Sequence, residues 1–183
     1  MFSLFQAFLK AWDAACASSG KVKIHIPPGT YKLGPVKFKG PCKNVTTLTI
    51  VHKGTIKAST NIDKYKSDYW VEFYRVNGLT LEGGGTFDGQ GADTWMHNSC
   101  SKKKHCQALP VSVKFIHTID TTVKRFKSIN PKFFHMAVIG CEKFHATNLT
   151  LEAPEESPNT DGIHIETSTN LKITDANIRT GDD

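Results

Sequence analysis

The chain has 183 residues, of which 39% are hydrophobic, and no apolar run approaches the roughly 20 residues that a membrane-spanning helix needs. This length and composition predict a single domain with a continuous core and without a membrane span. The net charge of +6 indicates a polyanionic partner, so nucleic acid, acidic polysaccharide and anionic membrane are the classes to be weighed.

The first 20 residues predict an amphipathic helix that caps the domain. Phe5, Phe8, Leu9, Trp12 and Cys16 recur at helical spacing and form one apolar stripe. The segment has no basic n-region and its apolar run is interrupted by polar residues, so no secretory signal peptide is visible in it. We expect a helix near residues 4 to 18 that covers the open end of a stack of strands.

From residue 21 onward the sequence predicts short strands separated by turns. Residues 48–50 and 54–56 recur at 79–81 and 85–87, and the apolar residues of 144–151 recur at 171–178. Val123, Phe126 and Ile129 form a looser copy. Repeats of this length favour a β-solenoid, in which each coil buries its inward side chains against its neighbours. A leucine-rich repeat shares the spacing, but its leucine and asparagine consensus is missing.

Cysteine usage indicates an oxidising compartment, because the five cysteines form no CxxC pair of a zinc site. They are Cys16, Cys42, Cys100, Cys106 and Cys141. Cys16 and Cys42 are candidates for a disulfide in the N-terminal region, and Cys100 and Cys106 for one that closes a small loop. Cys141 is left over, either as a buried free thiol or with a partner outside this sequence. Two N-x-Ser/Thr sequons agree with secretion.

Three acidic residues gather in the last part of the sequence. Asp161 belongs to the run Asn159-Thr160-Asp161-Gly162, and Asp182 and Asp183 follow Gly181. Asp161 and Asp183 are 22 residues apart, which fits one coil of a solenoid, and neighbouring coils lie ~4.8 Å apart. We therefore expect the three carboxylates to lie together, as in the acid/base set of a glycosidase or in a cation site. Either motif alone is also typical of a turn.

Four segments carry a resemblance to the plant polygalacturonases of glycoside hydrolase family 28, in particular the exo-acting pollen type. The segments are Tyr31-Lys32-Leu33-Gly34-Pro35-Val36, Gly83-Gly84-Gly85-Thr86-Phe87-Asp88-Gly89-Gln90-Gly91, Ser157-Pro158-Asn159-Thr160-Asp161-Gly162 and Thr180-Gly181-Asp182-Asp183. The resemblance implies an all-β domain over residues 1–183, a right-handed parallel β-helix of the pectin-lyase-like kind, with 1–20 as capping helix and 21–183 as coils. It also implies inverting hydrolysis of α-1,4-linked galacturonic acid in pectin by a secreted, monomeric protein of the cell wall.

The resemblance assigns roles to individual residues. It implies that Asp182 is the general acid and that Asp161 and Asp183 hold and deprotonate the attacking water. Crowding of like charges is expected to raise the pKa of at least one of the three. Asn159 either orients Asp161, bonds the substrate or is only a corner residue. His164 is expected to point away from the core, either bordering the cleft or solvated. No metal and no cofactor are expected.

The sequence departs from that family at both ends. The Gly-His-Gly and Arg-Ile-Lys motifs of the family do not occur in it, and Met1-Phe2-Ser3-Leu4 stands where the family has a glycine- and aspartate-rich strand. We expect a β-helix that is incomplete at the C-terminus and weak or no hydrolysis by these 183 residues. A non-catalytic pectin-binding fragment and a structural solenoid are the alternatives. A pectate lyase would need a calcium-binding carboxylate cluster with a catalytic arginine; Arg179 is close to the acidic residues, but the rest of that pattern is not evident. No recognition motif supports nucleic-acid binding.

Overall fold

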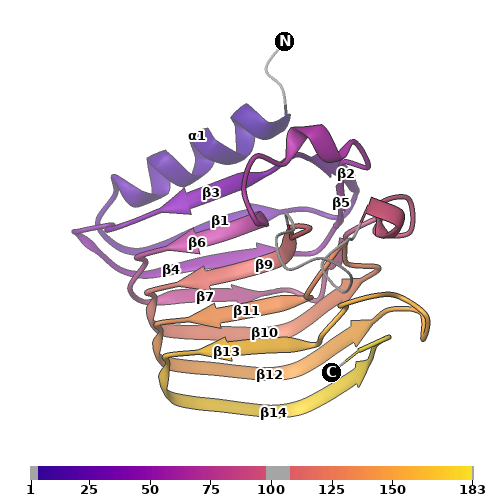
Figure 1. Ribbon diagram of the computed structural model, residues 1–183. Helices are drawn as coiled ribbons and strands as arrows, with labels where there is room; N and C mark the ends of the chain where they lie inside the picture. Colours follow the sequence, from indigo (N-terminus) through magenta and orange to yellow (C-terminus); the bar gives the residue numbers. More distant parts are fainter. Residues whose placement is uncertain (1–3, 98–107, 183) are drawn as a thin grey trace.

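The structure, a computed structural model, describes residues 4–97 and 108–182 and is a parallel β-solenoid with a helix at its N-terminal end (Figure 1). The elements are α1 (Leu4–Cys16), β1 (Gly20–Ile26), β2 (Thr30–Leu33), β3 (Val36–Lys39), β4 (Val45–His52), β5 (Thr55–Ala58), β6 (Tyr69–Tyr74), β7 (Leu79–Glu82), β8 (Thr86–Asp88), β9 (Val111–Ile116), β10 (Ile119–Ile129), β11 (Met136–Ile139), β12 (Glu142–Glu152), β13 (Ile163–Glu166) and β14 (Thr169–Arg179). Two short 3₁₀ turns, Ile62–Lys64 and Trp95–His97, lie in the connections.

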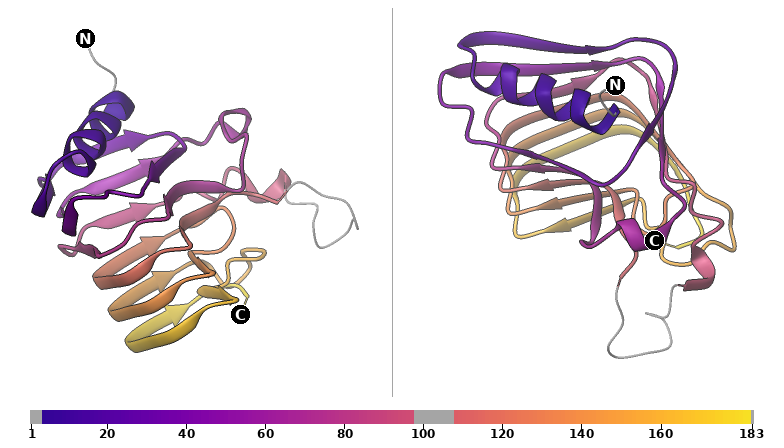
Figure 2. Two further views of the ribbon diagram at one scale, coloured as in Figure 1. Left: turned by 90° about the vertical axis from the view of Figure 1, so that its left-hand side faces the viewer. Right: turned by 90° about the horizontal axis from the view of Figure 1, so that it is seen from above.

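The strands form two parallel sheets that are wound by one continuous chain (Figure 2). Sheet A begins with the short pairs β1/β2, β4/β5 and β7/β8, which continue as the single long strands β10, β12 and β14. Sheet B has the order β3-β6-β9-β11-β13. This arrangement confirms the predicted parallel β-helix.

The register between coils confirms most of the sequence repeats. Leu48 pairs with Leu79 and Phe144 with Leu171, as the repeats predict. The looser copy is wrong at one position, because Ile129 pairs with Glu152, and the inward position that corresponds to Leu151 belongs to Ser128. Strand pairing advances by 23 residues from β10 to β12 and by 27 from β12 to β14, because the connections between the strands differ in length.

Helix α1 lies across the opening of the first coil and closes it (Figure 2). Trp12 is only 2% exposed, and its indole Nε1 donates to the carbonyl of Lys39 over 3.1 Å. The predicted stripe is wrong at Phe5, which is 38% exposed. A disulfide between Cys16 and Cys42 confirms the predicted link between the end of α1 and the first coil.

Aromatic rings form a column under the helix. Trp12 packs on Phe38 with ring centroids 5.0 Å apart, Phe38 on Phe73 at 5.2 Å, and Phe73 on Phe115 at 5.3 Å. The three phenylalanines are register partners on β3, β6 and β9, so the coil repeat itself builds the column. Removing one buried ring of this kind costs roughly 3–5 kcal/mol of stability.

The corner that follows sheet B has the same backbone conformation after β6, β9, β11 and β13. Arg75, His117 and Thr167 all have φ near +50°, and Gly140 stands at the equivalent place with φ +60°. The side chain of the residue after each of them points inward. Cys141, which follows Gly140, is buried for this reason. Its thiol is buried and unbridged, 3.3 Å from the Thr118 hydroxyl, which confirms the reading of Cys141 as a buried free thiol.

The last described coil has a different environment. Ile165 on β13 and Ile178 on β14 are 46% and 43% exposed, whereas their register partners Val138 and Leu151 are fully buried. Inward side chains of a solenoid are covered only by the coils on either side, so those of the last described coil are covered on one side alone.

Candidate active site

The two acidic segments meet at one corner of the solenoid. Asp161 lies in the connection 153–162 between β12 and β13, and Asp182 lies three residues after the end of β14. The backbone N–H of Gly181 donates to the hydroxyl of Thr160 over 3.1 Å. The residues that directly precede the two aspartates are therefore joined, and this contact fixes the spacing of the two backbones.

Two buried hydroxyls hold this corner together. The hydroxyl oxygens of Ser157 and Thr160 are 2.7 Å apart, and both residues are fully buried. The Ser157 hydroxyl also donates to the carbonyl of Pro154 over 2.6 Å. A Cβ atom on Gly181 would lie 2.3 Å from the Ser157 carbonyl oxygen, so only glycine permits this approach of the two segments.

Asn159 links the two acidic segments through its side chain. Its backbone has φ +52°, in the left-handed region that asparagine tolerates better than most residues. Its Nδ2 donates to Oδ2 of Asp182 over 3.3 Å. Orientation of an aspartate, one of the roles considered from the sequence, agrees with this contact to Asp182, and a role of Asn159 toward Asp161 stays a prediction.

Asp161 and Asp182 have different surroundings. The carbonyl of Asp161 accepts from the backbone N–H of His135 over 2.9 Å, and its side-chain Oδ1 is buried. Asp182 is exposed, and its carbonyl accepts from the Thr180 hydroxyl over 2.6 Å. Asp183 lies outside the described residues, so its place beside the other two stays a prediction. The sequence predicts a coil of 22 residues at this place. The hydrogen-bonded residues Thr160 and Gly181 are 21 positions apart, which is close to that value, whereas paired residues of β12 and β14 are 27 positions apart.

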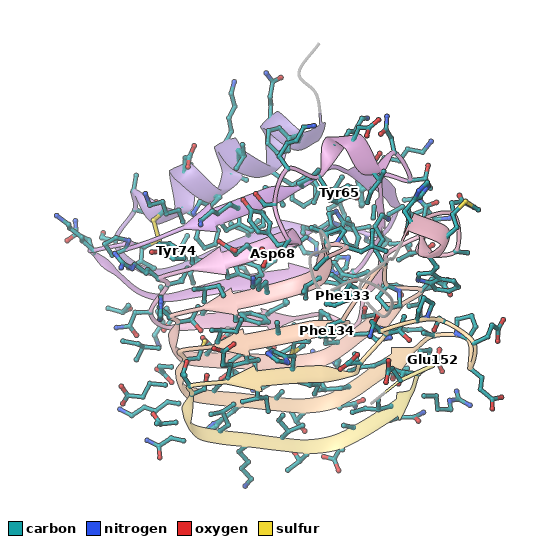
Figure 3. All side chains as sticks on the ribbon, in the orientation of Figure 1. Tyr65, Asp68, Tyr74, Phe133, Phe134 and Glu152 are labelled. Atoms are coloured by element: carbon teal, nitrogen blue, oxygen red, sulfur yellow. A yellow bond between two sulfur atoms is a disulfide. The ribbon has the colours of Figure 1, made fainter. Side chains whose placement is uncertain are left out.

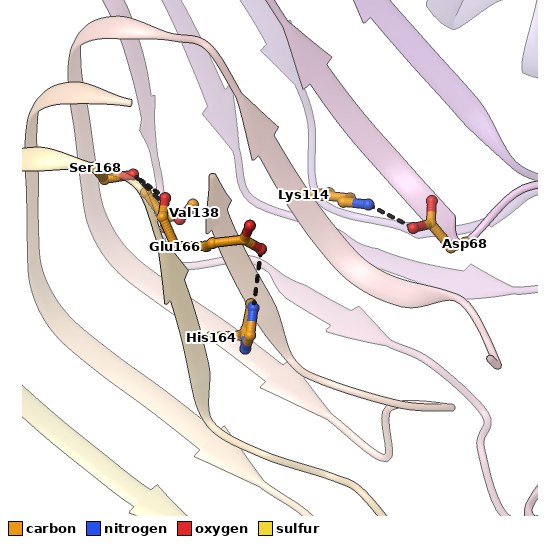
Figure 4. A network of polar contacts seen from close by, with 6 residues as sticks. All are labelled: Asp68, Lys114, Val138, His164, Glu166 and Ser168. Atoms are coloured by element: carbon orange, nitrogen blue, oxygen red, sulfur yellow. Dashed lines mark hydrogen bonds and ion pairs between the residues drawn. The ribbon is translucent and has the colours of Figure 1, made fainter. Parts of the chain in front are cut away.

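His164 lies on the outer face of sheet B, on β13, three residues after Asp161 in the sequence. Its ring stacks on that of Phe134 with centroids 5.1 Å apart, and its Nε2 lies 3.7 Å from Oε2 of Glu166 (Figure 4). The imidazole therefore contacts an aromatic ring on one side and a carboxylate on the other. On the same face, Lys114 donates to Asp68 over 2.6 Å (Figure 4).

The connection 130–135, which precedes β11, carries no motif that marks it in the sequence. Lys132 and His135 are buried in it, whereas Phe133 and Phe134 are half-buried and lie beside sheet B (Figure 3). Burial lowers the pKa of Lys132 to about 8 and that of His135 to about 3. A lysine and a histidine in a connection are usually solvated. Their burial would be indicated only by knowing that this connection lies against the glycine-rich segment 83–91 of another coil.

Glu152 forms ion pairs that the sequence does not predict. The guanidinium of Arg179 donates to Oε1 of Glu152 over 2.5 Å, and Lys127 lies 3.5 Å from the other oxygen. The hydrogen bond from Arg179, with Lys127 nearby, lowers the pKa of the Glu152 carboxyl below its ordinary value. Glu152, at the end of β12, is thereby held ionised close to where both acidic segments begin (Figure 3).

Other predicted features lie partly outside the described residues. Cys100 and Cys106 are among them, so their pairing stays a prediction. Within residues 4–97 and 108–182, no three His, Cys, Asp or Glu side chains are grouped so that they would hold a metal ion. None of the helices described in these ranges is long and apolar enough to cross a membrane.

Comparison with known proteins gives consistent matches. A family model described as glycosyl hydrolases family 28 matches residues 16–183. An exopolygalacturonase of Platanus acerifolia is 43% identical over 178 residues, which are 97% of this chain and 47% of that protein. An exopolygalacturonase of Arabidopsis thaliana is 41% identical, over 98% of this chain and 42% of that protein. The chain thus spans about half the length of the curated relatives it matches.

Solved structures share the fold. An exopolygalacturonase from Thermotoga maritima superposes with a TM-score of 0.81 at 19% identity, over all of this chain and 50% of that one. A polygalacturonase from Erwinia carotovora superposes with a TM-score of 0.80 at 24% identity, over 96% of this chain and 53% of that one. At these identities the likeness establishes the architecture alone.

Proposed function

Since this chain belongs to glycosyl hydrolases family 28, we propose that it carries catalytic aspartates of a polygalacturonase, a hydrolase of the α-1,4-galacturonosyl linkages of pectin. The observation that carries the proposal is the corner at which the Gly181 N–H donates to Thr160 and Asn159 donates to Asp182. These two contacts hold Asp161 and Asp182, which belong to different coils, at one place on the solenoid. The net charge of +6 suits a polyanionic substrate.

In the proposed reaction Asp182 is the general acid. The amide of Asn159 donates to Oδ2 of Asp182, so the proton of the acid is carried on Oδ1, from where it passes to the leaving glycosidic oxygen. Asp161 and Asp183 hold a water on the opposite face of the sugar and remove its proton, which inverts the configuration at the reacting carbon. The three-aspartate set requires that Asp183 lie beside the other two.

We further propose a secreted, monomeric protein that acts in the cell wall. The Cys16–Cys42 disulfide supports this proposal, because disulfides persist mainly in oxidising compartments. The curated relatives named above are exopolygalacturonases of plants. The competing candidate is a solenoid that binds polygalacturonate without hydrolysing it.

The test compares hydrolysis with binding in the same protein. Because the chain matches 47% of the Platanus exopolygalacturonase, residues 1–183 are fused in place of the matching segment of that enzyme, and the 183-residue chain is assayed beside the fusion. We expect the folded fusion to release reducing ends from polygalacturonate but not from an uncharged galactan. A folded fusion that binds oligogalacturonate without any release would establish the binding protein instead.

A further inference from the structure

The positive charge of the chain is concentrated at one end of the solenoid. Residues 14–62 contain eight lysines and no aspartate or glutamate, so this segment alone carries a charge of +8. The whole chain carries +6, which leaves −2 for all its other residues. The lysines lie in the first two coils, residues 20–58, and are Lys21, Lys23, Lys32, Lys37, Lys39, Lys43, Lys53 and Lys57. A polyanion is therefore attracted mainly to this end.

Three of these lysines lie on the outer face of sheet A. Lys21 and Lys23 on β1 are exposed and alternate with half-buried apolar residues, so their side chains point away from the core. Lys32 is exposed on β2, in the same coil. In the part of the chain that the structure describes, the ion pairs of the first two coils are made by Lys37 and Lys57, and these three ammonium groups make none. Their charge is therefore available to a ligand.

Hydroxyl groups lie beside these charges. Lys21 pairs in register with Thr47, and Lys23 with Thr49, both on the neighbouring strand β4. Neighbouring strands are ~4.8 Å apart, and residues two apart on one strand are separated by about 7 Å. The surface therefore offers ammonium groups and hydroxyls side by side. This combination suits a polymer whose sugar rings each carry a carboxylate and free hydroxyls.

Other polyanions fit this surface less well. None of the exposed large apolar side chains of the described residues lies within 20–58, so the lysines have no apolar anchor beside them that would enter a lipid bilayer. The segment also contains no arginine, which stacks on the bases of nucleic acids. The Cys16–Cys42 disulfide joins α1 to this same end and indicates an oxidising compartment. An acidic polysaccharide is therefore the favoured partner.

The basic surface is remote from the acidic corner. In sheet A the strands follow one another in the order β1, β4, β7, β10, β12 and β14, so β1 and β14 are five strand spacings, or ~24 Å, apart along the stack (Figure 1). Asp182 follows the end of β14 by three residues. A trisaccharide is shorter than this separation, whereas a long polymer reaches both places at once.

We propose that the exposed lysines and threonines of the first two coils form a second polygalacturonate-binding surface, separate from the acidic corner. This inference rests on the proposed function for the identity of the polyanion. Binding at this surface keeps the protein on the polymer and raises the effective concentration of other polymer segments at the acidic corner. Polymeric substrate therefore gains from the surface, and trigalacturonate does not.

Charge reversal tests this surface. Binding to immobilised polygalacturonate at low ionic strength is measured for the 183-residue wild type, for Lys21→Glu/Lys23→Glu and for the control Lys124→Glu/Lys172→Glu. The control changes the net charge equally, at exposed positions of β10 and β14 on the same sheet. Lysines on an outermost strand also prevent edge-to-edge pairing, a role that glutamates retain. We expect the first variant to weaken binding about tenfold and the control less than about twofold, with most of the difference lost in high salt.

Hydrolysis of trigalacturonate by the fusion described above separates this surface from the catalytic site. We expect Lys21→Glu/Lys23→Glu to leave that turnover unchanged. Equal weakening of polymer binding by both variants, no weakening by either, or equal wild-type affinity for phosphatidylserine vesicles overturns the polygalacturonate surface but not the hydrolase. Loss of trigalacturonate hydrolysis with polymer binding retained overturns only the hydrolase. Lys21→Thr/Lys23→Thr, which places strand-favouring residues there, should weaken polymer binding about threefold and serves if the glutamates lower the thermal midpoint.

Discussion

A buried histidine makes the free energy of unfolding of this fold depend on pH in the mildly acidic range. His135 is fully buried, its Nδ1 lies 2.8 Å from the Ser128 hydroxyl, and burial lowers its pKa to about 3. In the unfolded chain the pKa of a histidine is about 6.5. Between these two values the unfolded chain holds a proton that the folded chain does not, so the free energy of unfolding falls as the pH falls.

The size of the effect follows from the two pKa values. The loss is about 1.4 kcal/mol per pH unit below the unfolded pKa, or about 2 kcal/mol between pH 7 and pH 5. His52 has the same sign, because burial lowers its pKa to about 4. We expect His135→Asn, which keeps a polar partner for Ser128 but does not titrate, to lose about 2 kcal/mol less stability than the wild type over this range.

Urea unfolding at pH 7 and pH 5 measures this difference. Carboxylates contribute to the pH dependence of the wild type and of the variant alike, so the difference between the two isolates the histidine. His52→Asn should give a similar reduction, and the double variant should give the sum of the two, since the sites are separate. Identical pH dependence of wild type and His135→Asn would refute a neutral, buried His135.

Two further predictions concern covalent and polar links. The Cys16–Cys42 disulfide spans 26 residues, for which chain entropy gives about 3.5 kcal/mol, so the double variant Cys16→Ala/Cys42→Ala should lose that much in urea unfolding; a loss below about 1 kcal/mol would contradict this. Asn159→Gly keeps the positive φ possible but removes the donor to Asp182, and should leave the thermal midpoint nearly unchanged while lowering hydrolysis by the fusion about tenfold. Unchanged hydrolysis would remove Asn159 from the site, and Asn159→Ala, which adds the φ strain, serves as the comparison for stability.

The solenoid was predictable because its core repeats along the sequence. The inward residues of β12 and β14 follow one another at a fixed spacing, which predicts from the sequence that Phe144 and Leu171 are partners. The error at Ile129 arose where a polar side chain, Ser128, takes an inward place to bond His135. A search for repeated apolar residues misses an inward position that a serine occupies.

The site was less predictable because its contacts cross coils through connections of unequal length. Asn159 reaches Asp182 of another coil because the segment 153–162 lies against the residues that follow β14. The burial of Lys132 depends on the carbonyl of Gly89, which lies in another coil. Phe134 would be read from the sequence as a core residue, and only the inward turn of its neighbour His135 leaves its ring outside.

Substitution of Asp182 tests the central claim most directly. In the fusion of residues 1–183 with the Platanus enzyme, hydrolysis of trigalacturonate is compared between wild type, Asp182→Asn and the control Asp175→Asn, which lies on the same coil in β14 and is exposed. We expect Asp182→Asn to reduce turnover by at least ~10²-fold, as loss of a general acid does, with unfolding and trigalacturonate affinity unchanged, and Asp175→Asn to retain full turnover. Near-normal turnover of Asp182→Asn would remove Asp182 from the acid role and contradict the assignment of this corner as the catalytic site.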